Sequence, residues 1–299
     1  MAAAPTRHVR ADRPIPAQPA TVDLHTHSRR SDGVLEPAHL VADAAAAGVR
    51  LLALTDHDTL AGVREVARAA PTSLALLPGV EINCIVPAHA GHWEGELHVL
   101  GLGVDPDDEA FEAVLILQRG ARRTRFDRIL ARLRDLDMPI DEEIERLATT
   151  DDDALGRPTV ARALIARGHA TSVEDAFRRL LGHGMPAWVP RDGLGPVEAI
   201  AAIRAAGGLP VLAHFSEAAE RRSVVRDLVD VGLAGLEVHY LAWDAETVER
   251  VGDVADALGL VRTGGTDYHG DLGPYAEAIA ALSIPAGVGE RVRTRLARA

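Results

Sequence analysis

Two histidines one residue apart, His25 and His27, end a short stretch that is expected to form a strand. Side chains two residues apart on a strand point to the same face, so both imidazoles can meet at one point. Neutral imidazole is the commonest metal ligand that a protein offers. A single His-x-His pair is equally compatible with two polar residues at a sheet edge, so its meaning depends on the rest of the chain.

The same pattern, an apolar run followed by His, Asp or Glu, recurs along the chain. Potential ligands are expected at six strand ends, and these are His25 with His27, His57, Glu81, His98, His214, and Asp267 with His269. In parallel α/β folds the carboxyl ends of the strands form the active site, so these side chains should converge. A buried carboxylate among imidazoles is costly unless positive charge lies between them, and metal ions supply that charge.

The types of ligand narrow the choice of metal. Imidazole mixed with carboxylate, without thiolate, suits Mn, Fe, Zn or Co and argues against a structural zinc site. The set is too large for one ion, so two or three divalent ions are expected, with Glu81 as a bridge between them. Clustered ions can generate hydroxide at neutral pH and stabilise both oxygens of an in-line displacement at phosphorus.

The elements that must position these residues alternate between apolar runs and amphipathic segments. Strands are expected at 50–55, 74–77, 80–82, 97–102, 209–213, 236–238 and 260–263, and helices at 36–47, 60–69, 196–206, 224–231, 245–258 and 290–298. This alternation is typical of a parallel sheet covered by helices. Between 105 and 190 the apolar spacing is helical throughout, which predicts a helical insertion domain. The expected organisation is a disordered tail at 1–20, a first barrel part at 21–104, the insertion at 105–190, and a second barrel part at 191–299.

The bulk properties exclude several classes of protein. No apolar run among the 299 residues reaches the roughly 18 residues that span a membrane. The formal charge of −12 argues against binding to duplex nucleic acid, although a small phosphorylated substrate stays compatible if cations are bound. The single cysteine, Cys84, fits a reducing compartment, and the cytoplasm is the expected location.

The order of these motifs resembles that of the PHP (polymerase and histidinol phosphatase) family. The motifs are His25-x-His27, Asp32, Thr55-Asp56-His57-Asp58, Gly79-Val80-Glu81, His98-Val99-Leu100-Gly101, Ala213-His214 and Gly265-Thr266-Asp267-x-His269. The resemblance runs from about Val22 to Gly270 and implies a distorted, TIM-like (β/α)7 barrel. Gly156-Arg157-Pro158 and Phe177-x-x-x-Leu181-Gly182 resemble a branch of small phosphoesterases. That branch includes 3′,5′-nucleoside bisphosphate phosphatases and enzymes that trim short RNA from its 5′ end.

The resemblance implies a trinuclear metal site, with manganese as the expected metal and iron or zinc as alternatives. The implied ligand sets are His25, His27, Glu81 and Asp267 for the first ion, Glu81, His98 and His214 for the second, and Asp32, His57 and His269 for the third. A bridging hydroxide would attack phosphorus, and Arg157 would bind a substrate phosphate. His239 could assist, although a hydrogen-bonded core histidine is an equal alternative. Asp56 and Asp58 are expected to orient His57.

Two departures leave the substrate open. Thr159 stands where the branch usually has His, and Met185 stands where it often has Lys; both positions are thought to hold the distal phosphate. The first hypothesis is a phosphoesterase acting on a small nucleotide. The alternatives are a phosphatase or cyclic phosphodiesterase for another small ester, such as histidinol phosphate or a phosphorylated sugar, and a non-catalytic metal-binding scaffold. The 87–95 loop, with His89, His92 and Trp93, is expected to be solvated, with substrate contact as the alternative. The oligomeric state is left open.

Overall fold

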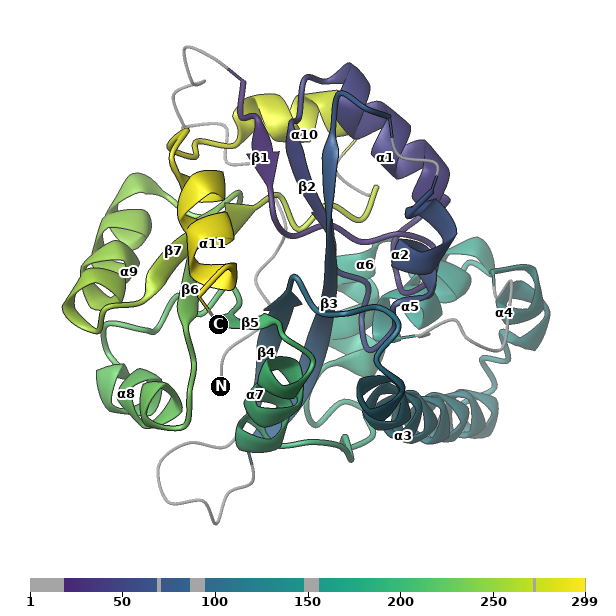
Figure 1. Ribbon diagram of the computed structural model, residues 1–299. Helices are drawn as coiled ribbons and strands as arrows, with labels where there is room; N and C mark the ends of the chain where they lie inside the picture. The colour runs from purple at the N-terminus through teal and green to yellow at the C-terminus, as the bar shows by residue number, and fades with distance from the viewer. Residues whose placement is uncertain (1–18, 69–70, 87–94, 148–155, 271–272, 299) are drawn as a thin grey trace.

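Seven strands follow one another around one sheet in chain order (Figure 1). The computed structural model describes residues 19–68, 71–86, 95–147, 156–270 and 273–298, so the predictions for 1–18 and 87–94 lie outside the described residues. The strands are β1 (Val22–Asp23), β2 (Leu51–Leu54), β3 (Ala75–Val86), β4 (Gly95–Leu102), β5 (Leu209–Leu212), β6 (Gly235–Tyr240) and β7 (Val261–Gly265).

The two ends of the sheet meet. The Leu24 amide donates to the Gly264 carbonyl at 3.1 Å, and Thr26 forms an isolated parallel bridge with Tyr268. These contacts join the chain after β1 to β7 and nearly close the sheet. The predicted seven-stranded α/β barrel is therefore confirmed.

The expectation of a parallel sheet is wrong around β4. This strand pairs antiparallel with both β3 and β5, whereas the other neighbouring strands pair in parallel. The reason lies in the connection. Parallel neighbours need a crossover of a dozen or more residues, and only 87–94 separate β3 from β4. The chain therefore turns back as a hairpin, which reverses β4.

Helices cover the outside of the barrel and close one end. The outer helices are α1 (Pro37–Ala46), α2 (Ala61–Val66), α7 (Pro196–Ala205), α8 (Arg222–Asp230), α9 (Ala245–Ala257) and α10 (Tyr275–Ala281). All of these except α10 were predicted to within a few residues. The C-terminal helix α11 (Val288–Leu296) places Val288 and Val292 in the same buried cluster as Val22 and Leu51. It therefore caps the interior of the barrel.

The chain between β4 and α7 forms a helical layer on one side of the barrel (teal in Figure 1). It consists of α3 (Glu109–Asp135), α4 (Asp141–Leu147), α5 (Arg157–Ala166), α6 (Val173–Ala176) and the π-helical turn η2 (Phe177–Leu181). Phe126, Leu133, Leu164 and Leu181 belong to an apolar cluster separate from those of the barrel. The domain boundaries at 104 and 190 stay predictions. None of the helices in the described ranges combines the length and apolar character needed to cross a bilayer.

Candidate metal centre

The predicted ligands come together at one end of the barrel. Those just beyond a strand end are His25, His27, His57, His214, Asp267 and His269. Asp32 lies in the loop that follows His27, whereas Glu81 and His98 lie inside β3 and β4. The expectation that all of these positions end a strand is therefore wrong for Glu81 and His98.

The length of the β3–β4 hairpin explains this difference. β3 has 12 residues and β4 has 8, whereas β2 and β5 have 4 each. His57, just beyond β2, forms an isolated bridge with Glu81, and the amide of Ala213, next to His214, donates to the His98 carbonyl at 2.9 Å. The middle of the long hairpin therefore lies level with the ends of its short neighbours.

Within this cluster, ligand atoms form three groups whose members lie within 4.8 Å of one another. The His25 group is His25, His27, Glu81 and Asp267; the His98 group is Glu81, His98 and His214; the Asp32 group is His27, Asp32, His57 and His269. These groups match the three predicted ligand sets, except that His27 also lies in the Asp32 group.

Glu81 joins the groups through its two carboxylate oxygens. Oε2 lies 3.3 Å from His25 Nε2, 3.1 Å from His27 Nε2 and 3.0 Å from His57 Nδ1. Oε1 lies 2.7 Å from His98 Nδ1 and 3.1 Å from His214 Nε2. Each oxygen thus faces a different part of the cluster, which is the geometry expected of a bridging carboxylate.

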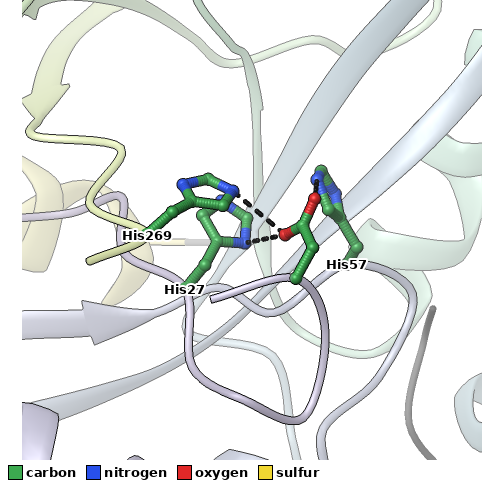
Figure 2. Close-up of side chains that lie close together, drawn as sticks. His27, His57 and His269 are labelled. Carbon is green, nitrogen blue, oxygen red and sulfur yellow. Dashed lines mark ion pairs between the residues drawn. The ribbon is translucent and has the colours of Figure 1, made fainter. Parts of the chain in front are cut away.

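Asp32 gathers three imidazoles around one carboxylate. Figure 2 shows the rings of His27, His57 and His269 turned toward one carboxylate. His269 Nε2 lies 3.0 Å and His27 Nδ1 lies 3.9 Å from Asp32 Oδ1. His57 Nε2 lies 3.6 Å from Asp32 Oδ2. These rings come from segments after β1, β2 and β7, so the group exists only in the folded chain.

The donor atoms fit divalent cations. Asp32 Oδ1 and His57 Nδ1 are buried, yet among the described residues neither has a hydrogen-bond partner, although charged atoms lie close. Burial would raise the pKa of Asp32 and of Glu81, but the surrounding histidines hold both well below the usual range. Burial would lower the pKa of His27, whereas Asp267 and Glu81 raise it to about 9. The carboxylates of the pocket are therefore ionised, and their charge is offset either by protonated imidazoles or by cations bound in place of those protons.

The backbone around the site is held in uncommon conformations. His214 and Asp267 have φ values of 32° and 50°, in a region that few non-glycine residues occupy. Gly265 allows β7 to approach His25, because an added Cβ would lie 2.5 Å from the Cβ of His25. Such conformations cluster at functional sites, where the surrounding structure holds them in place.

The carboxylates beside His57 do not have the predicted role. Asp56 accepts hydrogen bonds from the Ser28 amide at 2.7 Å and the Ser31 hydroxyl at 2.8 Å. Asp58 accepts from Arg122 at 2.8 Å and Arg191 at 3.1 Å. Both side chains therefore hold the loop and the helical layer around the site, and among the described residues neither is hydrogen-bonded to the His57 ring.

The predicted phosphate-binding residue Arg157 lies beside the cluster, at the first position of α5. Its Nη2 donates to Glu96 Oε2 at 3.2 Å, and Arg125 donates to the other oxygen of Glu96 at 3.3 Å. An added Cβ at the preceding Gly156 would lie 3.9 Å from Asp32 Oδ2, so the start of α5 adjoins the Asp32 group. His239 is buried on β6 and belongs to none of the three groups.

Two side chains at the site were not predicted. Glu237 is fully buried on β6 and contacts His25, and Asn83 on β3 lies 2.6 Å from His98 Nε2. A lone charged residue in the apolar stretch 235–240 was the available signal for Glu237. For Asn83 the signal was its place two residues after Glu81, on the same face of the strand.

Comparison with known families matches residues 23–157 to the PHP domain family. A 5′-3′ exoribonuclease of Haemophilus influenzae is 34% identical over 229 residues, which cover 76% of this chain and 77% of the relative. The chain belongs to the PHP family. This confirms the family predicted from the motifs.

Two further PHP-type relatives match over most of their length. A 3′,5′-nucleoside bisphosphate phosphatase of Chromobacterium violaceum is 31% identical, covering 84% of this chain and 87% of the relative. A structure from Bifidobacterium adolescentis, described as a metal-dependent phosphoesterase, superposes with a TM-score of 0.79 at 29% identity. It covers 93% of this chain and 98% of its own. The shared architecture therefore extends beyond the matched family segment.

Proposed function

We propose that the protein is a metal-dependent phosphoesterase that hydrolyses a phosphate ester of a small nucleotide. The observation that supports this most strongly is the placement of Glu81, whose two oxygens face separate sets of imidazoles at 2.7 to 3.3 Å. A carboxylate in that position, with five imidazoles around its two oxygens, suits a multinuclear site. A non-catalytic scaffold is not favoured, because every predicted ligand is present and the groups are complete.

The three groups would hold up to three divalent ions, with manganese as the expected metal and iron or zinc as alternatives. His25, His27, Glu81 and Asp267 would hold the first, Glu81, His98 and His214 the second, and Asp32, His57 and His269 the third. When bound, such ions supply a hydroxide nucleophile at neutral pH and stabilise charge on the phosphoryl oxygens.

The exposure of the ligands indicates where substrate enters. The side chains of His25 and His27 are fully buried, whereas those of His98 and His214 are 21% and 17% exposed. The open side of the cluster is therefore the side of the His98 group. The buried side excludes water and keeps the remaining imidazoles in fixed orientations.

Arg157 lies toward this open side and is our candidate for binding a substrate phosphate. Its partner Glu96 is two residues before His98, so both side chains leave β4 on the same face. Arg157 and Arg125 hold the pKa of Glu96, whose side chain is 29% exposed, at about 2. A phosphate group can replace this carboxylate as the partner of Arg157, since guanidinium groups bind both anions in the same bidentate way.

The nucleotide is the favoured substrate because two relatives of high coverage are named for nucleotide or RNA substrates. Thr159 stands at one of the two positions where the chain differs from the branch it resembles. It is buried, and among the described residues its hydroxyl has no hydrogen-bond partner, so it offers a polar atom there. His239 stays a candidate for assisting the reaction. We place the enzyme in the cytoplasm, where a single buried cysteine such as Cys84 stays reduced.

The test is hydrolysis by the full chain loaded with Mn²⁺, Fe²⁺ or Zn²⁺, in which the released phosphate, mononucleotide or ring-opened monoester is separated by chromatography. The substrates are a 3′,5′-bisphosphonucleoside, a 5′-phosphorylated dinucleotide, a cyclic phosphate and histidinol phosphate. We expect release from the first two, abolished in His57→Ala and retained in His39→Ala, which removes an exposed histidine on α1. Release from only the last two would replace the nucleotide with another small ester. No release by metal-loaded protein would overturn the proposal.

A further inference from the structure

The fully buried carboxylate of Glu237 lies outside the three ligand groups but contacts two of their members. Its Oε1 and Oε2 lie 3.1 and 3.3 Å from His25 Nδ1, and Oε2 accepts a hydrogen bond from the backbone amide of His214 at 2.8 Å. His25 belongs to the His25 group and His214 to the His98 group. One side chain of β6 thus contacts ligands that come from the ends of β1 and β5.

The contact with His25 determines which nitrogen of its ring carries the proton and which carries the lone pair that can bind a metal. Both oxygens of Glu237 face His25 Nδ1 and are acceptor positions, so this contact selects the His25 tautomer with the proton on Nδ1. The lone pair then lies on Nε2, which is 3.3 Å from both Glu81 Oε2 and Asp267 Oδ1. The wrong tautomer would present a proton to the ligand group, and a hydrogen-bonded carboxylate also makes the imidazole a better metal ligand.

The contact with His214 acts on the backbone. His214 has a φ of 32°, a conformation that is strained at a non-glycine residue and persists only where its surroundings hold it. Its amide points to Glu237, and its Nε2 lies 3.1 Å from Glu81 Oε1. The hydrogen bond from the amide therefore fixes the turn that aims this imidazole at the His98 group.

Resting on the proposed function, we infer that Glu237 is a positioning residue that couples metal binding at the His25 and His98 groups. Its hydrogen bonds go to His25 and His214, and neither of these residues belongs to the Asp32 group. Loss of its charge should therefore weaken binding at two groups together and leave the Asp32 group intact. A residue needed only for folding would lower stability without this selectivity.

The experiment titrates the chelator-stripped full chain with Co²⁺, followed by calorimetry and by the visible absorption of the bound ion. The principal variant is Glu237→Gln, which keeps the shape of the side chain. The NH2 of the introduced amide would face either His25 Nδ1–H or the His214 N–H. Two hydrogen-bond donors would then point at each other, and the hydrogen bond would be lost. Glu237→Asp keeps the charge but is one methylene shorter, and it should fail to reach both partners. Glu143→Gln is the matched control, because Glu143 is a buried carboxylate of the helical layer.

The unaltered chain and Glu143→Gln are expected to bind several equivalents of Co²⁺. In Glu237→Gln and Glu237→Asp, all but one equivalent of Co²⁺ should bind about tenfold to a hundredfold more weakly. Losses of this size are typical when the hydrogen-bond partner of a metal-binding histidine is removed. The equivalent that persists should disappear when His57→Ala is added. Circular dichroism establishes that each variant is folded.

Two results would overturn the inference while leaving the proposed function in place. One is a Glu237→Gln isotherm that superimposes on that of the unaltered chain, and the other is an equal loss at all equivalents in both folded variants. Absence of Co²⁺ binding by the unaltered chain would instead overturn the proposed function itself. The two failures are therefore distinguishable in one set of titrations.

Discussion

Arg122 donates two hydrogen bonds, from Nε at 3.0 Å and from Nη2 at 2.8 Å, to one carboxylate oxygen of Asp58. The two side chains are only 8% and 0% exposed. The same Nη2 also donates to Asn83 Oδ1 at 2.7 Å, and Asn83 contacts His98. Since Asp58 directly follows His57, this buried ion pair connects α3 of the helical layer to two segments that bear ligands.

Replacing Arg122 should therefore destabilise the protein. Arg122→Met leaves the buried charge of Asp58 with Arg191 alone, and removal of one partner of a buried pair costs about 3 kcal/mol or more. Urea unfolding of the metal-free chain measures this loss. Arg123→Met is the matched control on the same helix, because Arg123 is 60% exposed, and it should change the unfolding free energy by less than about 0.5 kcal/mol. Equal losses in both variants would mean that the buried pair contributes nothing special.

Metal ions should stabilise the folded chain strongly. The three groups are assembled from β3, β4 and the segments after β1, β2, β5 and β7, so the unfolded chain cannot offer them. A ligand at a hundredfold excess over its Kd adds about 2.7 kcal/mol to the unfolding free energy when it binds only the native state. Chelation followed by addition of Mn²⁺ or Zn²⁺ should then raise the Tm by about 5 °C or more.

The control for this measurement is a variant that removes a ligand. His57→Ala deletes one imidazole of the Asp32 group, and its Tm should rise less than that of the unaltered chain at the same metal concentration. His39→Ala should respond like the unaltered chain. A Tm that is insensitive to chelation and to added ions would speak against a metal site of any kind.

The convergence of His25, His57, His214 and Asp267 could be predicted because it depends on local signals. Each follows a short apolar run, and the carboxyl ends of neighbouring parallel strands lie together. The direction of β4 could not be read in the same way, because it depends on the length of a connection and not on the pattern within the strand. Glu81 and His98 were therefore placed at strand ends, although the hairpin continues past them.

Contacts between distant segments could not be predicted from the sequence patterns. Arg122 and Asp58 are 64 positions apart, and His25 and Glu237 are 212 apart, so no local spacing brings them together. Arginines on α3 look like an ordinary charged face, and only packing distinguishes the buried Arg122 from the exposed Arg123. The residues that brace the ligands thus required the three-dimensional fold, whereas the ligands themselves did not.

Substrate affinity should depend on Arg157. Removing a charge-assisted hydrogen-bond partner costs about 1.5–3 kcal/mol, so Arg157→Ala should raise KM about tenfold to a hundredfold with a smaller effect on kcat. Arg157→Lys should restore part of the affinity, because it keeps the charge but loses the bidentate geometry. Arg128→Ala, at a 59% exposed position of α3, is the control and should leave KM unchanged. An unchanged KM in Arg157→Ala would exclude this side chain from substrate binding.

A pH-dependent contribution to stability is expected from Asp175 at the start of α6. Its carboxylate accepts from the Thr171 amide at 3.1 Å and from Arg179 at 2.9 Å, and the Thr171 hydrogen bond is the main cause of a pKa below the ordinary value of 3.8. A carboxyl group with a lowered pKa stabilises the fold fully above its unfolded value and loses this effect as the pH falls through the folded value. The difference in unfolding free energy between the unaltered chain and Asp175→Asn should therefore be constant from about pH 7 to pH 5 and shrink below pH 3.8.

Ser172→Ala provides the contrast, because the Ser172 hydroxyl caps the same helix without titrating. Its removal should cost about 1 kcal/mol of unfolding free energy at every pH. Parallel pH profiles for the two variants would show that the charge of Asp175 is not what stabilises this turn.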